Sequence, residues 1–153
     1  MNTQKLLHTK EMKKVFLYCH DTLAFGHISR MLNIYHVLSQ DHDVYMIFWG
    51  KVPEKHVRDK NYISLPILQE KDIFENPKIS SKILQDRKKI LQRSIGVHKP
   101  DTLLIDYFPF GRIALKDEIE EIIKYIKEYK QEAKIYTFMR DIFHASSTLD
   151  RQE

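Results

Sequence analysis

The residues best suited to chemistry gather in one short segment near the start of the chain, after the apolar run 15–20. The segment contains His20, Asp21, Gly26, His27 and Arg30. An imidazole titrates near neutral pH, so His27 could act as a general base on a hydroxyl such as that of a sugar. A helix that starts near His27 would direct its N-terminal N–H groups at a phosphate or a developing oxyanion, and Arg30 would strengthen that site.

Each of these residues also has a structural interpretation. Gly26 would let the backbone approach a ligand closely, but it could equally form a tight turn, and one glycine does not meet the Gly-x-Gly-x-x-Gly pattern of dinucleotide sites. His27 could cap the helix, although its neighbours His20, Asp21 and Arg30 favour the functional interpretation. Zinc ligation by the two histidines and Asp21 lacks the closely spaced histidine or cysteine pairs of such sites, so we expect neither a metal nor a cofactor.

Two further polar clusters follow later apolar runs. Asp106 ends the run 102–106 and is followed by Pro109 and Gly111, and Arg140 and Asp141 follow the run 134–139. Asp106 could bind ligand hydroxyls, orient a histidine or cap the following loop. Arg140 and Asp141 could bind a ligand or simply pair with each other.

Alternating strands and helices are predicted to position these clusters. We expect strands at residues 15–20, 44–49, 62–65, 102–106 and 134–139, because each run is short, apolar and rich in β-forming residues. Helical patterns separate most of them, which favours a parallel sheet of about five strands in a Rossmann-like three-layer α/β sandwich. Ligands bind at the carboxyl ends of the strands in such sheets, so the three polar clusters should meet at that edge.

Apolar residues at helical spacing identify the faces that should pack on the sheet. The inward residues are predicted to be Ile28, Met31, Leu32, Tyr35 and Leu38 in the first helix, Ile79, Ile83, Ile90 and Leu91 in the second, and Leu115, Ile119, Ile122, Ile123 and Ile126 in the third. Asn76 and Pro77 should begin the second helix and Gly96 should end it. A basic run on that helix is predicted to be a solvated face, or else a surface that attracts anionic lipids or phosphates: Lys82, Arg87, Lys88, Lys89, Arg93 and Lys99.

Composition limits the remaining possibilities. With 153 residues, 42% of them hydrophobic, the chain can form one domain, which we place at 14–142 between a polar leader, 1–13, and a polar tail, 143–153. The net charge of +4 is dispersed, so no nucleic-acid partner is expected, and the single Cys19 excludes an internal disulfide. No segment is apolar for the length of a signal peptide or a membrane span, which predicts a cytoplasmic protein with at most peripheral membrane contact. Asp41-His42-Asp43 resembles a metal-binding Asp-x-Asp motif but should lie at the opposite edge of the sheet.

Three motifs in order resemble the amino-terminal half of predicted bacterial glycosyltransferases. They are HDTLAFGHISR after the first strand, KPDTLLIDYFPFG around the fourth and MRD after the fifth, and the similarity runs from Lys14 to Ile142. The resemblance is to glycosyltransferase family 28, whose members include the enzyme that adds N-acetylglucosamine to the peptidoglycan lipid precursor. That enzyme has several glycines where this chain has Leu23-Ala24-Phe25 before the single Gly26.

This resemblance implies one half of a GT-B fold and metal-independent glycosyl transfer. The amino-terminal half would bind a sugar or lipid-linked acceptor, with His27 as base or acceptor-orienting residue, Asp21 and Arg30 in support, and Asp106 and Gly111 lining the cleft. Since this sequence carries no donor half, we expect the nucleotide-sugar to bind only through a donor-binding partner and the isolated chain to be inactive. The alternative is a non-catalytic, flavodoxin-like binding or regulatory module.

Overall fold

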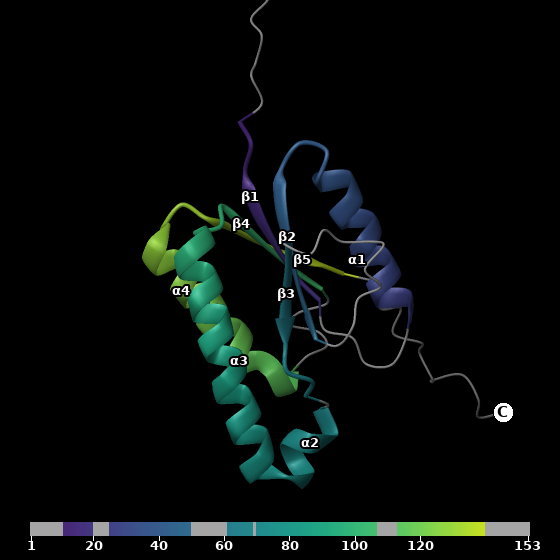
Figure 1. Ribbon diagram of the computed structural model, residues 1–153, viewed down its shortest axis with the longest axis vertical. Coiled ribbons are helices and arrows are strands. Elements are labelled where there is room, and N and C mark those ends of the chain that lie inside the picture. The colour runs from purple at the N-terminus through teal and green to yellow at the C-terminus, as the bar shows by residue number, and fades with distance from the viewer. Residues whose placement is uncertain (1–10, 20–24, 50–60, 69, 107–112, 140–153) are drawn as a thin grey trace, which may run out of the picture.

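The computed structural model describes residues 11–19, 25–49, 61–68, 70–106 and 113–139, with the backbone alone at 25–27, 70 and 113. Within these ranges five strands form a single sheet with the order β3-β2-β1-β4-β5, and every pair of neighbours is parallel (Figure 1). The strands are β1 (Lys14–Tyr18), β2 (Asp43–Trp49), β3 (Tyr62–Leu65), β4 (Thr102–Asp106) and β5 (Lys134–Phe138). The predicted parallel α/β sheet is therefore confirmed.

Helices cover both faces of this sheet. α1 (Phe25–Leu38) lies on one face, and α3 (Pro77–His98) and α4 (Lys116–Tyr129) lie side by side on the other (Figure 1). A short α2 (Glu70–Glu75) precedes α3, and a 3-10 turn, η2 (Ile113–Leu115), precedes α4. The result is a Rossmann-like three-layer sandwich. None of the helices in the described part of the chain has the length and apolar character that a membrane span requires.

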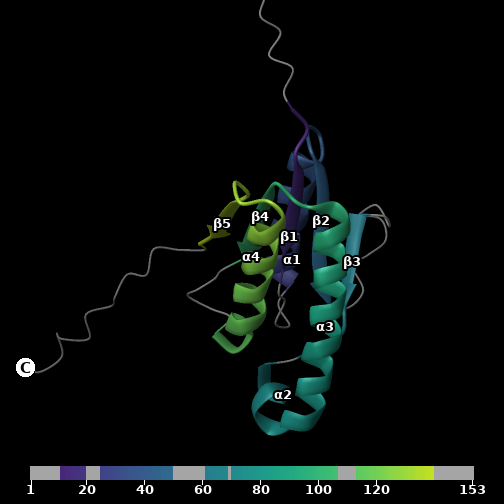
Figure 2. The same ribbon diagram turned by 90° about the vertical axis from the view of Figure 1, so that its left-hand side faces the viewer.

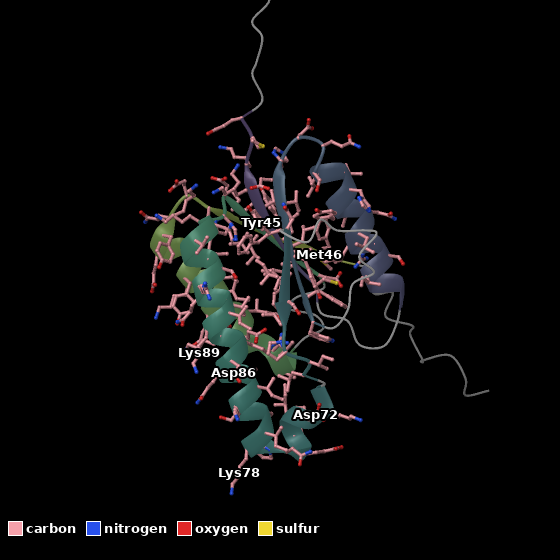
Figure 3. All side chains as sticks on the ribbon, viewed as in Figure 1. Tyr45, Met46, Asp72, Lys78, Asp86 and Lys89 are labelled. Atoms are coloured by element: carbon pink, nitrogen blue, oxygen red, sulfur yellow. The ribbon has the colours of Figure 1, made fainter. Side chains whose placement is uncertain are left out.

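The strands are apolar along their whole length because both of their faces are covered. In β2 all residues from Val44 to Trp49 are buried. Successive side chains alternate between the two faces, so Tyr45 points toward α3 and α4 while Met46 points toward α1 (Figure 3). Two apolar clusters result. On one face the helical side comes from Met31 and Tyr35 of α1, and on the other it comes from α3 and α4, through Leu91, Ile95, Ile119, Ile122 and Ile126.

The second helix differs from its prediction at both ends. Ile79 was expected on the inward side but is 61% exposed, because the first half of α3 extends beyond the sheet together with α2 (Figure 2). Gly96 was expected to end the helix but lies inside it. The helix ends instead at His98 and is capped by Lys99, whose φ of 47° is left-handed and whose N–H donates to the Ile95 carbonyl at 2.8 Å.

Gly96 has a packing role rather than a terminating one. A Cβ atom at this position would lie 3.2 Å from the Tyr129 Oη atom, which is tighter than an ordinary van der Waals contact. The absence of a side chain therefore leaves room for the Tyr129 hydroxyl beside the end of α3. The Lys99 ammonium lies over the Tyr129 ring, 6.0 Å from the ring centre.

Candidate functional site

The strand order changes direction between β1 and β4. From β1 the sheet continues through β2 to the edge strand β3, and from β4 it continues to the other edge strand, β5. α1 follows β1 on one face, whereas α4 follows β4 on the opposite face (Figure 1). In open α/β sheets, ligands bind outside the carboxyl ends of the strands at such a switch point.

An ion pair joins the two sides of this switch point. The Arg30 Nη2 atom, in the second turn of α1, donates to the Asp106 Oδ1 atom at the end of β4, with 2.5 Å between the two atoms. These residues are 76 positions apart in the sequence. The structure thus brings together one member of the first predicted cluster and one member of the second.

The two partners differ in their access to solvent. The Asp106 side chain is 0% exposed, whereas 31% of the Arg30 side chain is exposed. The Arg30 Nε atom is buried and has no hydrogen-bond partner among the described residues. Of this pair, only Arg30 has surface available to a ligand, and Asp106 holds the guanidinium in place.

The N-terminal end of α1, which carries a partial positive charge, comes one helical turn before Arg30 in the sequence. α1 begins at Phe25, so Gly26 and His27 belong to its first turn, and the expected start near His27 was two residues late. No acidic side chain lies in that first turn to neutralise the unpaired N–H groups. Gly26 is therefore a helical residue rather than part of a turn before the helix.

Several predicted site residues lie outside the described parts of the chain. These are His20, Asp21, Gly111, Arg140 and Asp141, together with the leader up to residue 10 and the tail 143–153. The side chain of His27 also lies outside them. Their convergence with Arg30 stays a prediction.

A second arginine–carboxylate pair was missed by the sequence analysis. Arg87 was assigned to a solvated basic face, yet it is fully buried between α3, α4 and the sheet, so that assignment was wrong. Its Nε and Nη2 atoms donate to the Glu118 Oε2 and Oε1 atoms, each at 2.8 Å. The spacing contained a signal: position 87 falls on the inward stripe of α3, between Leu84 and Leu91.

This buried pair is fully engaged by its surroundings. The Arg87 Nη1 atom donates to the Pro66 carbonyl at 2.7 Å, and the guanidinium lies 5.3 Å from the centre of the Trp49 ring. The Tyr18 hydroxyl donates to the Glu118 Oε1 atom at 2.5 Å. Burial, and then the negative charge of Glu118, raise the pKa of Tyr18 well above its ordinary value. These contacts tie β1, α3 and α4 together and leave the guanidinium no surface for a ligand.

The Asp41-His42-Asp43 motif lies at the opposite edge of the sheet, as expected. Asp43 begins β2, and its Oδ1 and Oδ2 atoms accept hydrogen bonds from the Asn61 Nδ2 atom at 3.0 Å and the Tyr45 hydroxyl at 2.8 Å. The His42 Nδ1 atom accepts from the Lys13 N–H at 3.3 Å. These groups organise the start of the sheet, and no three histidine, cysteine, aspartate or glutamate residues of the described ranges are grouped to hold a metal.

No family model, no curated protein and no solved structure matches the chain.

Proposed function

We propose that this domain is the acceptor-binding half of a nucleotide-sugar-dependent glycosyltransferase. The observation that supports this most is the Arg30–Asp106 pair at the switch point, where open α/β sheets bind ligands. The motif resemblance described above supplies the reaction. The nucleotide-sugar would be held by a donor-binding domain that faces the same edge of the sheet.

Arg30 and the start of α1 would bind an anionic group of the acceptor, such as the phosphate of a lipid-linked sugar. The Arg30 side chain is 31% exposed, and its ion pair with Asp106 fixes the orientation of the guanidinium. The unpaired N–H groups of the first turn of α1 add partial positive charge on the same side. Acceptor affinity should therefore depend on charge at position 30.

His27 would act one helical turn before Arg30. Its imidazole would accept the proton of the acceptor hydroxyl while the hydroxyl oxygen bonds to the anomeric carbon of the donor. The bond from that carbon to the nucleoside diphosphate breaks in the same step, and the diphosphate leaves. Spacing of three residues puts positions 27 and 30 on the same side of α1.

Transfer by the chain together with its donor-binding partner tests this proposal. The partner would be captured on the tagged chain, and transfer from a nucleotide-sugar would be measured for the pair. His27→Ala should lower the transfer rate by about 10²- to 10⁴-fold with no change in Tm. His36→Ala, on the exposed last turn of the same helix, is the matched control and should transfer normally.

The alternative, a non-catalytic α/β binding module, gains support from the complete burial of Asp106. That burial removes one carboxylate from the groups that could touch a reacting substrate. A module that only binds anions would need Arg30 and the start of α1 alone. Such a module would bind inorganic phosphate or a sugar phosphate and would show no glycosyl transfer. His27 would then be structural, so His27→Ala would lower Tm.

A further inference from the structure

Three aromatic rings join the last residue of α3 to the sheet. The centre of the His98 ring lies 4.0 Å from that of Tyr45 in β2, with 37° between the ring planes, and 6.0 Å from that of Phe16 in β1. The centres of the Phe16 and Tyr45 rings are 5.7 Å apart, so each ring contacts the other two. This ring cluster lies on the α3 and α4 face of the sheet, whereas the Arg30–Asp106 pair lies on the α1 face.

The backbone directly after His98 is strained. Lys99 is the only residue other than glycine with a positive φ in the described part of the chain. The left-handed region is unfavourable for a residue with a Cβ atom, so neighbouring contacts must hold Lys99 there. Its N–H donates to the Ile95 carbonyl, and two residues later the Asp101 N–H donates to the Lys14 carbonyl, each at 2.8 Å. The end of α3 is therefore a place where the loss of one side-chain contact can release the backbone.

The neutral form of His98 suits the ring cluster better than the charged form. The ring is half-buried, and the charged group of β1 that faces it is the Lys14 ammonium. From β2 it faces the Asp43 carboxylate, which favours protonation but already accepts hydrogen bonds from the Tyr45 hydroxyl and the Asn61 amide. Burial, and then Lys14, lower the pKa of His98 from its ordinary value despite the opposing charge of Asp43.

We propose that His98 is an acid-sensitive contact, which holds the end of α3 on the sheet at neutral pH and releases it in mild acid. A protonated imidazole is repelled by Lys14 and loses hydration in the ring cluster, so protonation favours a state in which the ring moves into water. The strained backbone at Lys99 can then relax, which opens the last turn of α3. Tyr45 does not titrate in this range, since burial and its hydrogen bond to Asp43 raise its pKa to about 12.

Hydrogen exchange of the Lys99 and Asp101 amides measures this opening in the whole chain. Because the folded pKa of His98 is the lower one, its contact contributes fully above the unfolded pKa of about 6.5 and is lost as pH falls through the folded pKa. The protection factors of the two amides should therefore fall between about pH 7 and 5. Linkage predicts a tenfold fall for each unit by which the folded pKa lies below the unfolded pKa.

Two histidine variants test whether His98 causes this dependence. His98→Phe keeps an aromatic ring but cannot bind a proton, so its protection factors should no longer depend on pH in that range. His36→Phe makes the same change at an exposed position of α1 and should behave like the unsubstituted chain. A pH dependence that persists in His98→Phe would overturn the proposal.

NMR titration of the histidine rings in the unsubstituted chain is an independent test that needs no variant to fold. The His98 ring signals should titrate below about pH 6.5. At neutral pH they should be shifted upfield by the Tyr45 ring, and this shift should disappear as the imidazole is protonated and leaves the ring cluster. A pKa at or above the ordinary value, or an upfield shift that survives protonation, would contradict the release of His98 in acid.

Discussion

Two arginine–carboxylate pairs lie on opposite faces of the sheet, and they differ in what surrounds them. Arg30 and Asp106 meet on the α1 face at the end of β4, with 31% of the arginine side chain exposed. Arg87 and Glu118 meet on the α3 and α4 face, where the arginine is 0% exposed and also contacts Pro66, Tyr18 and Trp49. The fully buried Arg87 can only stabilise the fold, whereas the partly exposed Arg30 can also contact a ligand.

The largest effect should come from removing one partner of the Arg87–Glu118 pair. Glu118→Ala leaves a buried guanidinium without its counter-charge and should lower the free energy of unfolding by about 3–5 kcal/mol. Urea denaturation measures this loss. The double variant Arg87→Met with Glu118→Leu replaces both charges and should recover most of the stability. If both changes together cost as much as Glu118→Ala alone, the loss does not come from an uncompensated charge.

A smaller loss is expected when the same kind of change is made at the switch point. Arg30→Ala should cost about 1–3 kcal/mol, because water can reach the space left by a partly exposed side chain and hydrate the Asp106 carboxylate. It should also weaken acceptor or phosphate binding by about 10- to 100-fold, which matches the loss of a charge-assisted hydrogen bond. Equal losses of stability for Arg30→Ala and Glu118→Ala would erase the contrast between the two pairs.

The hydroxyl of Tyr18 makes the stability that comes from the Arg87–Glu118 pair depend on pH. Because burial and Glu118 raise its pKa, its contribution to stability is fully present below the unfolded pKa of about 10 and is lost as pH rises toward the higher folded pKa. Tyr45, which donates to Asp43, behaves alike, since burial and that hydrogen bond raise its pKa to about 12.

Alkaline unfolding curves measure this effect. Tyr18→Phe should lower the free energy of unfolding at neutral pH by about 0.5–1.5 kcal/mol, because one hydrogen bond is lost. It should also flatten the fall of that free energy between about pH 9 and 11, the range within about one unit of the ordinary tyrosine pKa. Tyr136→Phe, at an exposed position of β5, is the control and should leave the curve unchanged. A decline as steep in Tyr18→Phe as in the parent chain would contradict the assignment.

The smallest effect is expected at the surface pair of Lys88 and Glu121. Their side chains are 41% and 42% exposed, so water already solvates both charges and salt screens them. Lys88→Ala should leave the urea midpoint within the error of measurement. If Lys88→Ala lowered the free energy of unfolding as much as Arg30→Ala, exposure would not predict how much an ion pair contributes to the stability of this protein.

The elements with a single dominant pattern could be predicted from the sequence. The all-apolar run of β2 and the regular stripe of α4 each allow one interpretation, and the structure confirms both. The predicted edge of the sheet for Asp41-His42-Asp43 was also correct, because it follows from the order of strand and helix alone. Arg30 and Asp106 were both expected at the carboxyl edge, and they do meet there.

The remaining features depend on contacts between distant segments. A basic residue on a charged helix ordinarily faces water, and it is the carboxylate of Glu118, 31 positions away, that neutralises Arg87 in the interior. Gly96 resembles a helix stop until the Tyr129 ring is placed beside it. Ile79 has the spacing of a core residue, but the sheet does not reach that far along α3.

The glycine beside Tyr129 leaves room for that ring at the ends of α3 and α4. Gly96 lies in the last turn of α3, and Tyr129 is the last residue of α4. A methyl group at position 96 would require the Tyr129 hydroxyl to give way by a few tenths of an ångström, and because Tyr129 is 54% exposed, its side chain can turn aside while both helices stay in place. The effect of such a substitution would therefore appear first where the Tyr129 ring meets the Lys99 ammonium, rather than in the spacing of the two helices.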